Sequence, residues 1–219
     1  MRRWLWLNGL ALVSFGAFAI FLVGQSLVGW HAYNGDLQHL GMPALSFLAY
    51  LGSGHFVEAT TENWESEFLQ MGAYVVLTAM LVQRGSPESN PPDQSKDDDP
   101  SDPKQIKKDS PPPVHRGGLA LKLYENSLSI TLFGLFALSF VLHLLGGTAE
   151  ENVERRAEGE PETSPDQFIR TSQFWFQSLQ NWQSEFLAVG LLIVGTIFLR
   201  QRGSAQSKKV AEPHTSSGK

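Results

Sequence analysis

One seven-residue stretch occurs twice in the chain and decides its fold. Residues 63–69 are Asn-Trp-Glu-Ser-Glu-Phe-Leu, and residues 181–187 are Asn-Trp-Gln-Ser-Glu-Phe-Leu. When residues 63–86 are aligned with residues 181–204, 14 of the 24 positions are identical. The same offset of 118 residues aligns residues 8–19 with residues 126–137. An internal repeat of this length indicates a duplicated structural unit.

Each copy of the repeat contains two apolar runs. The four runs are residues 4–28, 68–82, 128–145 and 186–199. A helix that crosses the hydrocarbon core of a bilayer needs about 20 mostly apolar residues, so the first and third runs are of ordinary length. The second and fourth are shorter. We therefore expect Trp64 and Glu67, and their equivalents Trp182 and Glu185, to be drawn into the outer membrane interface.

The sequence predicts an all-α membrane protein with four transmembrane helices, arranged as two tandem hairpins related by a parallel repeat. We expect the first two-span repeat at residues 1–86 and the second at residues 119–204. Between them, residues 87–118 hold 8 of the 12 prolines together with acidic and basic blocks. Such a composition is typical of a disordered linker. We expect residues 205–219 to form a disordered tail.

The positive charges predict the orientation of the chain in the membrane. Lysine and arginine collect on cytoplasmic segments. The amino end, the segment between the second and third runs and the segment after the fourth run hold 14 of the 17, whereas residues 30–62 hold none. Both termini and the linker are therefore expected in the cytoplasm. Arg84 and Arg202, each followed by a glycine, are expected in the last turns of the second and fourth helices.

The segments within the hairpins also carry a helical pattern. Aromatic and leucine side chains follow one another at helical spacing in the second copy, at Phe168, Trp175, Leu179, Trp182 and Phe186. They predict an amphipathic outer helix that continues into the fourth span. A weaker version runs from residue 56 to residue 68.

Polar residues that recur in both copies are the candidate functional or anchoring residues. They are Glu67, Glu185, Asn63, Asn181, Trp64 and Trp182, together with Gln25 and His143, which occupy equivalent positions at the outer ends of the first and third spans. A carboxylate next to an apolar run is costly and marks a candidate functional group. Gln25 and His143 are at the right depth to hydrogen-bond these acids, and a glutamate–histidine pair can shuttle protons or bind a cation.

The alternative interpretation of these residues is structural anchoring. Asn63 and Asn181 would cap helices that begin nearby, and Trp64 and Trp182 would belong to an aromatic belt at the interface. Four further residues are candidates for helix packing: Asn8, Asn126, Gly72 and Gly190. The two asparagines are expected to hydrogen-bond between helices, and the two glycines to mark close helix contacts.

Several classes of function are disfavoured by what the sequence lacks. The absence of cysteine excludes disulfides, thiolate catalysis and cysteine-ligated metals. A net charge of −5 without a basic excess argues against nucleic acid as a partner. No nucleotide-binding glycine loop or zinc-type His-Glu-x-x-His motif occurs. We therefore predict no catalytic residue, no metal site, no cofactor and no enzymatic activity.

The leading prediction is a structural, envelope-associated or partner-binding membrane protein, with the lipid bilayer and either a second copy of the chain or another membrane protein as partners. The alternative is a small channel or proton-linked transporter that uses Glu67 and Glu185.

The chain resembles an uncharacterised family of small bacterial four-span membrane proteins, which carry a domain of unknown function. The resemblance rests on the tryptophan motif at residues 181–187, on Tyr-Glu-Asn-Ser-Leu at residues 124–128 and on Arg-Gln-Arg-Gly-Ser at residues 200–204. It covers nearly all of the chain except the linker and the tail. It implies a multi-pass protein of the bacterial inner membrane, and it implies no activity, substrate or catalytic residue.

Overall fold

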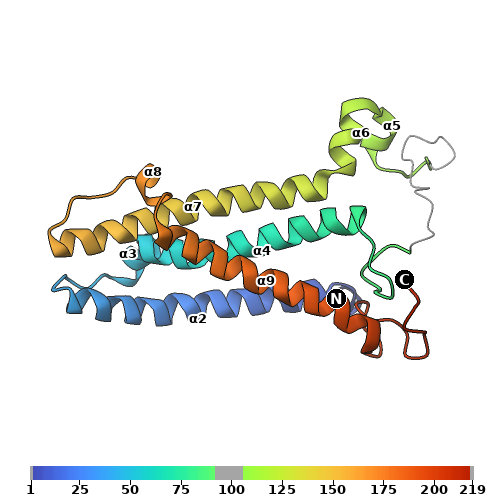
Figure 1. Cartoon of the computed structure of the whole chain (residues 1–219), viewed down its shortest axis with the longest axis horizontal. Coiled ribbons are helices and arrows are strands. Elements are labelled where there is room, and N and C mark those ends of the chain that lie inside the picture. Colours follow the sequence, from blue (N-terminus) through green and yellow to red (C-terminus); the bar gives the residue numbers. More distant parts are fainter. Residues whose placement is uncertain (1, 92–105, 218–219) are drawn as a thin grey trace. The chain divides into compact units, whose positions relative to one another are not determined.

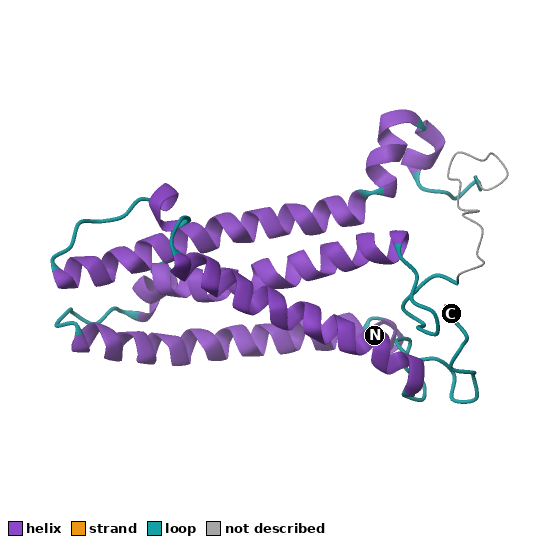
Figure 2. Ribbon diagram, viewed as in Figure 1, coloured by secondary structure: helices purple, strands orange, loops and turns teal. Residues whose placement is uncertain are grey.

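The computed structural model describes residues 2–91 and 106–217 (Figure 1). Over these residues the chain forms helices, turns and loops, and no strand (Figure 2). The helices are α1 (Arg2–Leu7), α2 (Gly9–His39), α3 (Phe47–Leu51), α4 (Gly54–Met80), α5 (Pro112–Arg116), α6 (Gly118–Glu125), α7 (Ser127–Glu158), α8 (Pro165–Phe168) and α9 (Ser172–Phe198).

The helix boundaries recur with the offset found in the sequence. Helix α9 begins and ends 118 residues after α4. Helices α7 and α8 begin 118 residues after α2 and α3, and α6 ends 118 residues after α1. Residues 1–86, the first half, and residues 119–204, the second half, therefore have the same order of short helix, long helix, short helix and long helix.

The loops that follow α2 and α7 are closed by the same pair of hydrogen bonds. The Asn34 side chain accepts a bond from Leu45 N (2.7 Å) and donates one to Leu45 O (3.0 Å). At the equivalent positions, the Asn152 side chain accepts from Thr163 N (2.7 Å) and donates to Thr163 O (2.9 Å). We call each of these an asparagine clamp. Each clamp satisfies both backbone groups of one loop residue and so fixes the loop between the helices.

The caps of α4 and α9 lie well before the predicted ones. The hydroxyls of Ser53 and Thr171 each accept a hydrogen bond from the backbone N–H three residues on, both at 3.3 Å. This is the N-cap geometry, which stabilises a helix by about 1 kcal/mol. The prediction that Asn63 and Asn181 are caps is wrong, because both lie inside helices that run unbroken past them.

Helix α9 runs unbroken from the predicted amphipathic segment into the fourth apolar run, as the periodicity predicts. Helix α9 contains four of the five residues that carried the pattern, from Trp175 to Phe186, whereas Phe168 belongs to the separate helix α8. The weaker pattern of the first half also lies within one helix, α4.

The carboxyl ends of these two helices differ from the prediction. Helix α4 ends at Met80 and α9 at Phe198, so Arg84 and Arg202 lie in the turns that follow and not in the last helical turn. The glycines after these arginines do adopt positive φ angles, 86° at residue 85 and 83° at residue 203. The left-handed conformation therefore shapes a turn beyond the helix in both halves.

Two segments for which disorder was predicted contain ordered structure. In the linker, Pro112–Arg116 form α5, whereas residues 92–105 lie outside the described residues. In the tail, Lys208 is only 4 % exposed, and its Nζ donates to backbone oxygens that include Gly85 O (2.6 Å) and His214 O (3.0 Å). The tail is thereby tied to the turn that follows α4.

Three of the helices, α2, α7 and α9, are long and apolar enough to cross a membrane. Helix α7 contains the third predicted span, α9 contains the fourth except for residue 199, and α2 contains the first from residue 9, because residues 4–7 belong to the separate helix α1. Helix α4, which contains the second span except for residues 81 and 82, is 27 residues long, but Glu65 and Glu67 lie just before its apolar run. The fold is thus all-helical over the described residues, with three candidate membrane spans.

The chain forms two compact units. The first comprises residues 1–62 and 140–175, and the second comprises residues 63–139 and 176–219. Each unit combines segments of both halves. The buried core of the first unit is formed by Tyr33, Leu37 and Tyr50, with Trp30 and Phe56 among the side chains packed against it. The domain boundaries that follow the repeat stay a prediction.

Candidate functional site

Helices α4 and α7 approach each other closely in the first unit because both carry glycine at the contact. A Cβ atom added to Gly146 would lie 2.6 Å from the backbone nitrogen of Glu58. One added to Gly54 would lie 2.7 Å from the carbonyl oxygen of Gly146. Real Cβ atoms do not come so close to backbone atoms, so the two helices reach this distance only with glycine at these positions.

This close contact brings together three side chains that can bind a cation. Glu58 and Glu62 lie one turn apart on α4, and His143 lies on α7. His143 Nε2 is 3.9 Å from Glu62 Oε2. One nitrogen or oxygen atom from each of the three residues lies within 4.8 Å of the other two. We call these three residues the Glu–Glu–His cluster.

The cluster is buried on the histidine side and open on the glutamate side. The His143 side chain is fully buried, whereas that of Glu62 is 20 % exposed. The His143 ring stacks on the ring of Phe174, with centroids 4.9 Å apart and planes inclined by 27°. Phe140 and Phe168 pack edge-on against the same Phe174 ring. These three phenylalanine rings fix the plane of the imidazole and cover its buried face.

A second polar group in the first unit surrounds His55. The Tyr33 and His55 rings stack at 4.5 Å, and the Tyr50 hydroxyl lies 3.4 Å from His55 Nδ1. Tyr33 OH donates a 2.9 Å hydrogen bond to Glu150 Oε2. Burial lowers the pKa of His55 below its usual value, against the opposing effect of the Asp36 charge. His55 is therefore favoured in its neutral form.

Gln25 and His143 were predicted to hydrogen-bond the two acids of the repeated motif. In the structure, other residues lie beside Gln25 and His143. Gln25 Nε2 donates to Thr60 Oγ1 (3.4 Å), and His143 lies beside Glu62. Glu67 and Glu185 belong to the second unit. There they interact electrostatically with each other, with Glu67 exposed and Glu185 half-buried.

The two tryptophans of the repeated motif have different surroundings. Trp182 Nε1 donates a 2.9 Å hydrogen bond to Glu65 Oε1, and its ring packs edge-on against Phe136. Glu65 is fully buried. Trp64 is 36 % exposed. Trp182 therefore joins α9 to α4 and α7 within the second unit.

The asparagines predicted to join helices bond within their own segments. Asn8 Nδ2 donates to Trp4 O (2.8 Å), and the equivalent Asn126 Nδ2 donates to Lys122 O (2.9 Å). Each of them lies where a short helix ends and a long one begins. Asn181 likewise donates to a carbonyl four residues earlier, at 3.2 Å. These amides therefore stabilise local turns of the chain.

The two glycines predicted to mark helix contacts also differ. A Cβ atom on Gly72 would lie 3.3 Å from the ring of Phe133, so α4 and α7 are close there. A Cβ atom on Gly190 would meet no atom within 4 Å. The helix-contact prediction therefore holds for Gly72 and fails for Gly190.

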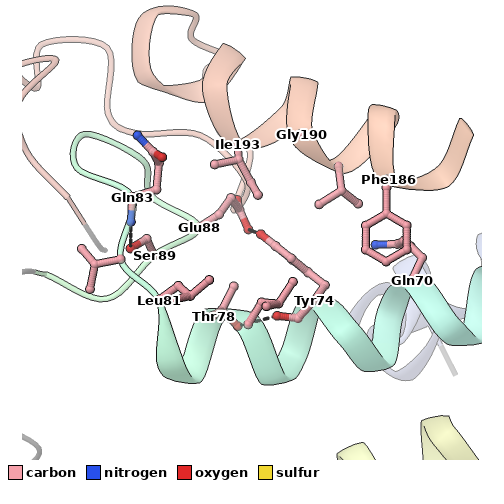
Figure 3. A pocket seen from close by; sticks show the side chains of 13 residues that line it. Gln70, Tyr74, Thr78, Leu81, Gln83, Glu88, Ser89, Phe186, Gly190 and Ile193 are labelled. Carbon is pink, nitrogen blue, oxygen red and sulfur yellow. Dashed lines mark hydrogen bonds between the residues drawn. The ribbon is translucent and has the colours of Figure 1, made fainter. Parts of the chain in front are cut away.

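Gly190 instead faces a pocket of about 300 Å³ between α4 and α9 in the second unit (Figure 3). The side chains that line it include Leu77, Leu81, Phe186, Val189 and Ile193. At one end, the Tyr74 hydroxyl donates to Glu88 Oε2 (3.1 Å). The pocket is mostly apolar, and this hydrogen bond joins two of the polar side chains in its lining.

The sequence pointed to His143 but missed both glutamates of the cluster. The acids were selected because they recur in both halves, whereas the equivalents of Glu58 and Glu62 are Phe176 and Gln180. Their spacing of four residues, continued by Glu65 three residues on, was the available signal. It indicated acids on one face of a helix, but it could not reveal which histidine faces them.

Comparison with known proteins identifies the family and goes no further. No curated protein matches the chain, and no solved structure matches it. The model of one protein family, DUF6766, matches residues 1–219 and is described as a domain of unknown function. The chain therefore belongs to the DUF6766 family.

Proposed function

We propose that this protein is a four-span integral membrane protein with a non-enzymatic, structural or partner-binding role in the bacterial inner membrane. The observation that carries the proposal is the exposure of apolar side chains along α2. Leu10 is 86 % exposed, Phe15 73 % and Ile20 71 %. Exposure of this much apolar surface to water on a helix of 31 residues is unfavourable, whereas lipid tails or apolar partner helices would cover it.

The length of α4 supports a fourth span. Its apolar run of 15 residues is short for a crossing, but its 27 residues correspond to about 40 Å at a rise of about 1.5 Å per residue. The hydrocarbon core is about 30 Å thick. With Trp64 and Glu67 at the outer interface, where the aromatic ring and the carboxylate reach water, the rest of α4 to Met80 is about 20–24 Å long, so the crossing requires local thinning of the bilayer.

The number of spans can be tested by cysteine accessibility, because the chain contains no cysteine of its own. Single substitutions Gln38→Cys, Ser101→Cys and Ala205→Cys are introduced, and intact cells are treated with a membrane-impermeant maleimide. Four spans with cytoplasmic termini predict labelling at residue 38 alone. Residues 101 and 205 should react only after the cells are permeabilised.

A different pattern would contradict the proposal in a specific way. If α4 did not cross the membrane, residue 101 would share the side of residue 38, and residue 205 would also be labelled from outside. Resistance of the protein to carbonate extraction is the control for membrane insertion. Release of the wild-type chain by carbonate would contradict a membrane-spanning protein of any topology.

The role itself is tested by asking what covers the exposed apolar faces. We propose a second copy of the chain as the first partner to examine, since two hairpins present little polar lining of their own. Two differently tagged copies, expressed together and extracted in mild detergent, should co-purify. Mixing of separately extracted copies is the control for exchange in detergent. Recovery of each tag alone would contradict self-association.

One observation favours a second function, a proton-linked transporter. Glu67 and Glu185, which recur in both halves, interact electrostatically in the second unit. Paired carboxylates are a common element of proton-transfer sites, because like charges close together disfavour the ionised form of one of them. In proteoliposomes, the double variant Glu67→Gln with Glu185→Gln should abolish flux while folding persists, and Glu125→Gln should leave flux unchanged. Absence of proton flux through the wild-type protein would exclude this function.

A further inference from the structure

We propose that Glu58, Glu62 and His143 form a binding site for one divalent transition-metal ion, of the Zn²⁺, Co²⁺ or Mn²⁺ class. The site lies in the first unit, where α4 meets α7. It is independent of the proposed function, which uses none of these three residues. No known metal-binding motif occurs in the chain, and of the three residues only His143 was a candidate from the sequence.

The distances fit a metal site that closes around its ion. Donors at 2.0–2.2 Å from a tetrahedral ion lie about 3.4 Å from one another. In the cluster, His143 Nε2 and Glu62 Oε2 are 3.9 Å apart, and the three donor atoms lie within 4.8 Å of each other. Rotation of the two glutamate side chains is enough to close the remaining gap, while His143 is held by its stacking on Phe174.

The donor set selects the class of metal. One imidazole nitrogen with two carboxylate oxygens suits zinc, manganese, iron and cobalt, whereas calcium and magnesium prefer oxygen donors alone. With a neutral imidazole, the two carboxylates carry a charge of −2, which a divalent cation neutralises. This compensation matters in a site that is half-buried on one side and closed by aromatic rings on the other.

The backbone is built to hold the two helices at the distance that the site needs. Gly146 contacts the backbone of Glu58 itself, and a Cβ atom on Gly147 would lie 3.1 Å from Glu58 Oε1. The glycines therefore set both the position of the Glu58 backbone and the space that its carboxylate occupies. Three protein ligands leave one coordination position for water or a substrate, on the side where Glu62 is exposed.

The repeat provides a second argument, because the equivalent sequence positions carry no metal ligands. The residues equivalent to His143, Glu62 and Glu58 are Gln25, Gln180 and Phe176. In each of these three pairs, the member in the cluster has a side chain that commonly binds metal ions, whereas its equivalent has an amide or a phenyl ring. Because the chain contains this set of three ligands in one of the two equivalent positions, we expect one bound ion per chain.

The test is titration of the full-length, detergent-solubilised protein with Co²⁺ and with Zn²⁺, followed by calorimetry. Because cobalt binds polyhistidine, the purification tag must contain no histidine. The protein lacks cysteine, so no thiolate competes for the metal. We expect one ion per chain. Affinity should fall at acidic pH, because the imidazole must be deprotonated to bind.

Two variants that restore the residue of the other half decide the assignment. His143→Gln and Glu62→Gln should each weaken binding by about 100-fold or more, since loss of even an outer partner of a metal ligand costs about 10- to 100-fold. His31→Gln and Glu125→Gln, which make the same chemical changes at exposed positions, should bind as the wild type does. Size-exclusion chromatography checks that each variant is folded.

The proposal is overturned if the wild-type protein binds neither Co²⁺ nor Zn²⁺, or if folded His143→Gln binds them with unchanged affinity. It is also overturned if the two control variants lose binding to the same degree. Should His143→Gln fail to fold, Glu62→Gln and Glu58→Gln decide the matter, because an amide replaces a carboxylate there without change of shape. Unchanged affinity in both would exclude the site.

Discussion

The two halves of the chain share their backbone design and differ in their buried polar groups. Both have a long helix, an asparagine clamp, a short helix and a second long helix at equivalent positions. The Glu–Glu–His cluster, in contrast, takes its glutamates from the first half and its histidine from the second. Glutamine or phenylalanine stands at each equivalent position. Since the duplication, the frame of each half, meaning its order of helices and its loop contacts, has been preserved, whereas the ionisable groups have diverged.

This difference separates residues that build the helices from residues that act between them. Where an equivalent pair makes the same contact, such as Asn34 and Asn152, the contact serves the frame of each half. Where only one member of a pair has an ionisable side chain, such as His143 and Gln25, the difference marks a candidate function. Four predictions test this distinction.

The first prediction concerns two equivalent glycines that lie beneath equivalent buried aromatic rings. A Cβ atom on Gly29 would run into the Tyr50 hydroxyl, and one on Gly147 would lie 2.7 Å from Phe168 Cε1. Both rings are only 1 % exposed. Gly29→Ala and Gly147→Ala should each lower the free energy of unfolding by roughly 1–3 kcal/mol through overpacking. Unfolding in mixed micelles at increasing SDS measures this.

Two other equivalent glycines provide the control for that experiment. Gly16 and Gly134 have no atom within 4 Å of an added Cβ. Their replacement by alanine should be neutral or stabilise by up to about 1 kcal/mol, since alanine has the higher helix propensity. A large loss at only one of Gly29 and Gly147 would break the equivalence of the two halves.

The second prediction concerns the asparagine clamps. Asn34→Ala and Asn152→Ala each remove two hydrogen bonds to one loop residue, and each should cost about 1–2 kcal/mol. The two losses should be equal within error. Asn→Asp at either position keeps the acceptor but turns a carboxylate oxygen towards the loop carbonyl, so it should cost at least as much as alanine. Hydrogen exchange at Leu45 and Thr163 would localise the effect, and unchanged protection there would count against the clamps.

The third prediction concerns the bond between Trp182 and Glu65, which joins the two halves in the second unit. Trp182→Phe keeps the ring contact with Phe136 and loses the hydrogen bond, at a cost of about 1 kcal/mol. Glu65→Gln installs the residue of the equivalent position 183, keeps an oxygen acceptor and should cost less. Thermal unfolding followed by circular dichroism measures both. A larger loss for Glu65→Gln would show that its charge matters more than this bond.

The fourth prediction is a dependence of stability on pH that arises in one half only. Burial lowers the pKa of His55, so the folded state binds its proton less readily than the unfolded state does. This contribution to stability is present above about pH 6.5, the usual histidine pKa, and is lost as the pH falls below it. His55→Gln, which installs the residue at position 173, should flatten the dependence between pH 7.5 and 5.5. An unchanged slope would argue against the lowered pKa.

The repeat predicted much of the fold and little of the site. A constant offset requires equal loop lengths, so helices α4 and α9 were expected to correspond, and they do. The periodicity of aromatic residues predicted that α9 continues into the apolar run. It could not locate the caps, because Ser53 and Thr171 lie ten residues before the asparagines that capping preference favoured. Local preference does not show where a long helix begins.

The site escaped prediction for a related reason. Recurrence in both halves was the criterion for a candidate acid, and it selects residues of the common frame. Glu58 and Glu62 have no acidic equivalents and were passed over. Their role depends on the approach of α4 to α7, which glycines at 54 and 146 permit. Contacts between segments so distant in sequence are not visible in a local pattern.

The asparagine clamps also bear on how the chain folds during synthesis. Each clamp joins residues only 11 positions apart, and each hydroxyl cap acts across three. Contacts so local form quickly, without the loss of entropy that closure of a long loop requires. Each hairpin can therefore set its own loop as it leaves the ribosome, before the other half has been made. The metal ligands come from both halves, so they meet only after the second hairpin is complete.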